Sequence, residues 1–62
     1  MSNEKVQPVM TALSDAQKAV MRVQTALKEG NPLAVQIPMY DRLGKIITEL
    51  RNMMMEAQRL PL

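Results

Sequence analysis

Apolar residues recur every three or four positions in two segments of this chain, and a stretch rich in Gly and Pro separates the segments. In the first segment the spacing is 3,4,3,4, and in the second it is 4,3,4,3. Such spacing places apolar side chains along one side of an α-helix and is typical of helices that pack side by side. The members of the two stripes are Val6, Val9, Leu13, Ala16, Val20, Val23 and Leu27, and then Met39, Leu43, Ile46, Leu50, Met53, Ala57 and Leu60.

The pattern predicts an all-α chain that forms one domain, 1–62, with helices over about 5–29 and 38–59. Helices of nearly equal length joined by a short connection are antiparallel neighbours, so we expect a coiled-coil-like helical hairpin. Their bounds follow from ordinary end signals: an Asn cap, prolines that fit the first turn, a Gly just past a helix end and a terminating Pro. These residues are Asn3, Pro8, Gly30, Pro38 and Pro61.

The connection, residues 30–37, has two interpretations. Asn31 followed by Pro32 can open one helical turn. Leu33, Val35 and Ile37 instead alternate with polar or small residues, as in an extended half-buried segment. We expect an ordered loop in which these three apolar side chains cap the open end of the helical core. An edge offered to a partner strand is the less favoured interpretation, because a lone short strand has no sheet to extend.

Assigning heptad letters shows apolar rows beyond one seam. On the first helix Val6 begins row a and Val9 begins row d. From residue 12 onward row g is entirely small: Ala12, Ala19 and Ala26. Small residues at a period of seven favour close approach of another helix. We expect this row to form a dimer interface.

On the second helix Leu43 begins the heptad's row a and Met39 begins row d. Row e is also apolar: Tyr40, Ile47 and Met54. A two-helix hairpin needs only rows a and d, so we expect row e and the Ala row to remain exposed in a single copy. A second copy would bury them in a four-helix bundle with two-fold symmetry.

The same side of the second helix is also a candidate surface for a different protein. Arg51 and Met55 lie beside row e, and Tyr, Arg and Met are enriched at protein interfaces. Met21 and Met55 are apolar residues on sides expected to be solvated, and flexible Met side chains suit adaptable binding surfaces. The predicted partner-binding residues are Tyr40, Ile47, Arg51, Met54 and Met55.

Composition argues against catalysis. The 62-residue chain contains neither His nor Cys, so it lacks the common general base, the thiolate nucleophile and the soft or imidazole metal ligands. We therefore predict no catalytic site, no cofactor and no metal site. Met53, Met54 and Met55 are consecutive on a helix and point about 100° apart, so they cannot converge on one Cu(I) ion. A core this small also needs an oligomer or a partner for stability.

Charge allows a nucleic-acid alternative but does not favour it. The net charge is only +2, and acids interrupt the basic row of the second helix. With one Tyr and no Phe or Trp, no aromatic platform for base stacking exists. In size and predicted shape the chain resembles small plasmid-encoded hairpin dimers of the Rop type, which bind RNA. The resemblance is architectural and rests on no shared motif.

The sequence therefore predicts a small homodimeric regulator, adaptor or inhibitor that binds a larger protein. The alternatives are a regulator associated with RNA or DNA, and a structural subunit or chaperone of a secretion or phage assembly. The polar start carries no signal-peptide core and no apolar run is long enough to span a bilayer, so we expect a cytoplasmic protein without membrane contact.

Overall fold

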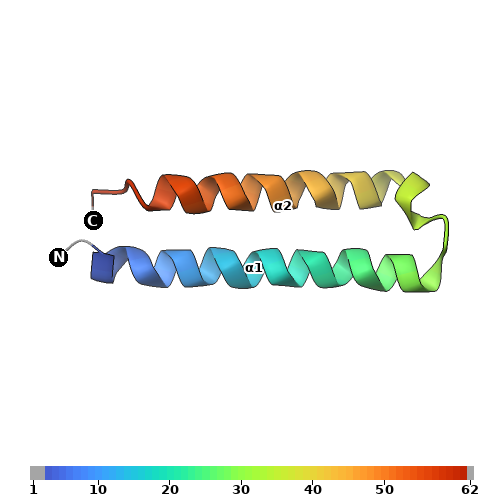
Figure 1. The fold of residues 1–62 in the computed structure, drawn as a ribbon, viewed down its shortest axis with the longest axis horizontal. Coiled ribbons are helices and arrows are strands. Elements are labelled where there is room, and N and C mark those ends of the chain that lie inside the picture. The colour runs from blue at the N-terminus through green and yellow to red at the C-terminus, as the bar shows by residue number, and fades with distance from the viewer. Residues whose placement is uncertain (1–2, 62) are drawn as a thin grey trace.

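A computed structural model describes the backbone of residues 3–61 and the side chains of residues 4–61. Within these residues the chain forms two long helices joined by a 3-10 turn, and no strand. Helix α1 spans Asn3–Gly30, the turn η1 spans Ala34–Gln36, and α2 spans Pro38–Ala57. The two helices lie side by side and antiparallel (Figure 1), in a rod measuring 47 × 14 × 9 Å. The predicted all-α hairpin is confirmed.

The helix ends follow the expected signals except at Pro8 and Gly30. Pro8 was predicted to lie in the first turn, but α1 already begins at Asn3, so Pro8 is its sixth residue and lies inside the helix, where it has no N–H to donate to the Glu4 carbonyl. Pro38 begins α2, and Ile37 before it is extended, with φ −80° and ψ 129°, as a residue preceding proline should be. Gly30 was expected just past the helix end. It is instead the last residue of α1, and neither it nor any other described residue has a positive φ. The backbone N–H of Asn31 donates to the carbonyl of Leu27 at 3.0 Å, so ordinary helical geometry continues to this point. The predicted capping role of Asn3 lies outside the described side chains.

The connection is a turn, which corrects the favoured prediction for it. The side-chain oxygen of Asn31 accepts from the N–H of Leu33 at 3.0 Å, and the Ile37 N–H donates to the Ala34 carbonyl at 2.9 Å. Because a 3-10 helix has three residues per turn, Ala34 and Ile37 face the same side. Ala34 is fully buried and Ile37 half-buried, whereas Leu33 is 60 % exposed and Val35 55 %. The core end is therefore capped by Ala34 and Ile37, and Leu33 and Val35 point outward.

The seam between the helices is built from rows a and e, where rows a and d were expected. The buried and half-buried members on α2 include Leu43 and Leu50 of row a together with Tyr40, Ile47 and Met54 of row e. Row d is exposed: Met39 by 47 %, Ile46 by 44 %, Met53 by 39 % and Leu60 by 39 %. The expectation that row e would stay uncovered in a single copy is thus wrong, and row d takes that place.

A physical reason for this rotation lies in how the two helices meet near the connection. Rows d, a and e together span about 100° of a helix surface, and a single neighbouring helix covers only part of that arc. On the e side, Gly44 has no side chain, and a Cβ placed there would lie 3.6 Å from the amide nitrogen of Gln24. That amide donates to the carbonyl of Tyr40 at 3.4 Å. This hydrogen bond holds the e side of α2 against α1.

Candidate functional site

One long side of the hairpin is apolar and uncovered. We call it the apolar face; it consists of rows d and g of α1 and row d of α2. Val23 is 45 % exposed, and the row-d residues of α2 are exposed as given above. Its members on α1 are Val9 and Ala16, which are half-buried, and Ala12, Ala19, Val23 and Ala26, which are exposed. Its members on α2 are Met39, Ile46 and Met53, and Leu60 follows just after the helix end.

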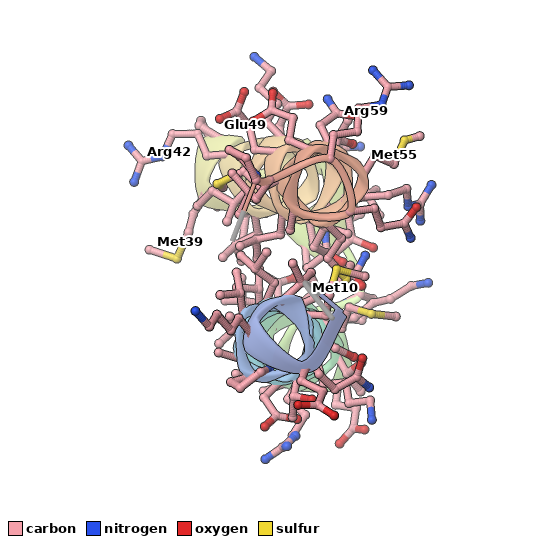
Figure 2. The ribbon with its side chains drawn as sticks, turned by 90° about the vertical axis from the view of Figure 1, so that its left-hand side faces the viewer. Met10, Met39, Arg42, Glu49, Met55 and Arg59 are labelled. Carbon is pink, nitrogen blue, oxygen red and sulfur yellow. The ribbon has the colours of Figure 1, made fainter. Side chains whose placement is uncertain are left out.

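Helix geometry places these rows on one side. Both helices use rows a and e for the seam, and row d lies on the opposite flank of row a from row e. When such helices are antiparallel, the two d flanks fall on the same side of the pair. Figure 2 shows this arrangement end on: Met39 and Arg42 project to the left, while Met10, which belongs to row e of α1, lies to the right of the seam. Met55 also projects to the right.

The opposite side, which we call the mixed face, combines polar and apolar side chains. Its part near the connection is an open hollow lined by Gln24, Tyr40, Asp41, Gly44, Lys45, Thr48 and Glu49. A second shallow hollow nearer the other end includes Met10, Ser14 and Met54. One polar group here, the Thr48 hydroxyl, donates to the Gly44 carbonyl one helical turn earlier at 3.2 Å. Neither hollow is enclosed, so neither isolates a bound molecule from solvent.

The predicted dimer row is exposed along its length. Ala12, Ala19 and Ala26 all contact solvent and form the outer edge of the apolar face on α1. They therefore belong to the same surface as Ile46 and Met53, a connection that sequence reasoning missed. The sequence shows that row g lies next to row d on α1. It does not show that row d of α2 lies on the same side, because that depends on how α2 is rotated about its axis.

The predicted partner-binding residues divide into two groups. Tyr40, Ile47 and Met54 are half-buried against α1, whereas Arg51 and Met55 are exposed, Met55 by 56 %. Met21, singled out from the sequence as an apolar residue on a solvated side, is 50 % exposed. A partner on this side would therefore contact Arg51 and Met55 directly and only the edges of the other three.

Charges on the hairpin are interspersed rather than segregated. Lys45 Nζ lies 3.2 Å from a carboxylate oxygen of Asp41, one helical turn away, and both side chains are largely exposed. Such an exposed pair contributes roughly 0.3 to 0.5 kcal/mol. It also partly neutralises one of the cations that a phosphate backbone would otherwise meet.

Neither described helix contains a window apolar enough, and free enough of charge, to cross a bilayer. Among the described residues no three Asp or Glu side chains gather as a candidate metal site. No family model, curated protein or solved structure matches the chain. What the chain does must therefore be inferred from its two faces.

Proposed function

We propose that this chain is a non-catalytic protein-binding module, a small regulator, adaptor or inhibitor, that works as a homodimer. In this proposal two hairpins form a four-helix bundle through the apolar face, and the mixed face binds a larger protein. The observation that carries the proposal is the apolar face itself. Five large apolar side chains on it are each more than a third exposed in a single hairpin: one Val on α1, three residues on α2, and Leu60 just after the end of α2.

Burial supports the homodimer. Among the described residues only Val6, Ala34 and Ala57 are buried apolar residues, and none of the larger side chains is fully buried. A chain of 62 residues with so small a core needs further apolar burial to remain folded. Covering the apolar face supplies that burial without using the mixed face.

Arg51 and Met55 support protein binding at the mixed face, and Met21 adds an exposed apolar side chain in a hollow on the outer side of α1. Arg and Met are enriched at protein interfaces, and Met side chains adapt to irregular surfaces. Arg51 and Met55 would stay exposed after dimerisation, because they lie away from the apolar face. Leu33 and Val35 add an exposed apolar tip at the connection.

Binding of RNA or DNA has weaker support. Lys45 is paired with Asp41, and Glu49 and Glu56 interrupt the cations along α2. A gel shift with total RNA at low and moderate salt tests this alternative. Phosphate-driven binding would appear at low salt and fall steeply as salt rises.

The test of the main proposal has two steps. Light scattering at micromolar concentration should give about 14 kDa, twice the mass of one chain. Capture from an extract of the native cell, with the immobilised dimer, should then retain a larger protein. A folded species of 7.0 kDa would contradict the homodimer, and a dimer that retains nothing but RNA would contradict protein binding.

A further inference from the structure

We infer the orientation of the second copy: α1 packs antiparallel on the second copy's α1, and α2 on its α2, so that the two connections lie at opposite ends of the bundle. This inference rests on the homodimer proposed above and specifies its geometry. The occupant of the apolar face is then a second copy of this chain, related by a two-fold axis perpendicular to the helices.

The exposed area fits such an occupant. The chain exposes 4920 Å², whereas a compact protein of this mass exposes about 4,000 Å². The excess, about 900 Å², reflects the rod shape of a single hairpin, and two such rods side by side need to bury only roughly 800 Å² each to form a standard stable interface. A second hairpin of the same length can cover the apolar face from end to end.

The apolar rows also meet the requirement of such an axis. A perpendicular two-fold axis must cross both helices at one level of the hairpin. On α1, Val9 and Val23 are equally far from Ala16. On α2, Ile46 and Met53 are equally far from the boundary of Glu49 and Leu50.

The hydrogen bond from Gln24 to Tyr40 fixes the register of the hairpin. Counting back eight residues from Gln24 and forward eight from Tyr40 places Ala16 level with Thr48. Both helices rise about 1.5 Å per residue, so the two midpoints agree to within about 3 Å. One axis can therefore bring Val9 onto the second copy's Val23 and, on α2, Ile46 onto its Met53.

Charges at the rim select this orientation. Arg42 and Glu56 edge the apolar face on α2, seven residues on either side of Glu49, and are exposed. An antiparallel α2 pair centred there brings each Arg42 level with the second copy's Glu56. On α1 the same axis brings Lys5 within about two residues of the level of the second copy's Glu29, also an opposite charge. Two acidic residues near the axis, Glu49 and Asp15, each lie level with the same residue of the second copy and so form the like-charge pairs of this arrangement.

The other two-fold arrangement places like charges together. If the axis ran along the helices, α2 would pack on the second copy's α1. Arg42 would then be level with Arg22 of the second copy, and Glu49 with its Asp15. Like charges juxtaposed at an interface disfavour that docking, whereas the apolar contact area is similar in both. The charges therefore determine the orientation, and the apolar rows supply the affinity.

A disulfide tests the orientation directly. The chain has no Cys, so the Ala16→Cys variant carries a single thiol. In the inferred dimer this position meets its own copy at the axis, and mild oxidation should link most of the protein into covalent dimers. The Thr11→Cys variant, on the solvated side of α1, is the matched control and should remain uncoupled at the same concentration.

Charge reversal provides a second test without oxidation. Arg42→Glu and Glu56→Arg should each weaken the dimer about tenfold, because two pairs are lost and two repulsions are gained. The double variant should restore the affinity, since opposite charges again face each other. Arg59→Glu makes the same charge change away from the face and should leave dimerisation unchanged. The measurement is the dimer dissociation constant from sedimentation equilibrium.

The outcomes separate this inference from the proposed function. A stable dimer in which Ala16→Cys does not cross-link, or in which the double variant is no better than the single variants, overturns the orientation and leaves the homodimer standing. A wild-type chain that sediments as a folded monomer overturns both.

Discussion

The two long sides of the hairpin differ in the polarity of the side chains at the edge of the seam. On the mixed face, polar side chains such as Gln24 close the edge of the seam, and its amide donates to the Tyr40 carbonyl. On the apolar face, Ala19 and Ile46 are exposed with no polar group between the row-d stripes of the two helices. A helix pair in water can end at a polar edge, whereas an apolar edge of this length requires a cover. The same seam therefore has a polar edge that is stable in water on the mixed face, and an apolar edge on the apolar face that needs to be covered.

A cation placed on the apolar face should have the largest effect on the dimer. Ala19→Arg places a long charged side chain where the second copy's helix approaches, so we expect loss of the dimer and of most helicity. Gln7→Arg makes the same addition on the mixed face and should change neither. Light scattering and circular dichroism measure both effects. If Ala19→Arg leaves mass and helicity unchanged, the Ala row faces water and the contrast is wrong.

Dilution tests the same contrast without a mutation. Folding coupled to association makes the thermal midpoint depend on chain concentration, since the unfolded state is favoured by dilution. We expect the midpoint to rise by several degrees over a hundredfold increase in concentration. Melts followed by circular dichroism provide the measurement. A midpoint that does not change would mean that one hairpin is stable with its apolar face uncovered.

Changes on the mixed face should separate binding from folding. The double variant Arg51→Glu with Met55→Ser removes one exposed cation and one exposed apolar side chain. Surface changes of this kind usually alter stability by less than about 1 kcal/mol, so the melt should be nearly unchanged. Capture of the partner should fail, because the lost apolar contact is worth roughly 1 to 2 kcal/mol when desolvated. Retained capture would move the binding surface to Leu33 and Val35, and a collapsed melt would place the two residues in the core.

Two glycines give the smallest expected effects. A Cβ at Gly44 would lie 3.6 Å from the Gln24 amide, an ordinary contact, and at Gly30 it would meet nothing within 4 Å. Both residues are helical without a positive φ. Gly44→Ala and Gly30→Ala should therefore each stabilise the fold, by up to about 1 kcal/mol. Chemical denaturation measures the change; a loss of stability at Gly44 would show that its close approach to α1 tolerates no side chain.

Much of the fold follows from the sequence because helix periodicity and proline signals act locally. Pro38 fixes the start of α2, and the seven-residue spacing fixes which rows are apolar. The rotation of α2 does not follow, since Met39, Leu43 and Tyr40 are all apolar and any two adjacent rows could face α1. That choice goes with the hydrogen bond from Gln24 to the Tyr40 carbonyl, which is a tertiary contact between residues 16 apart. For the same reason the sequence could predict the Ala row as an interface, but it could not predict that Ile46 and Met53 lie on the same surface as that row.

The turn between the helices also has a kinetic consequence. Its hydrogen bonds join residues two or three apart in sequence, such as Leu33 to Asn31 and Ile37 to Ala34, so they form without closing a long loop. Val6 and Ala57, buried at the opposite end of the rod, are separated by nearly the whole chain (Figure 1). Contacts of short sequence separation form first because they lose less chain entropy. Each hairpin should then zip from its turn toward Val6 and Ala57, on the microsecond to millisecond timescale of helical proteins, leaving association of two chains as the slow, concentration-dependent step.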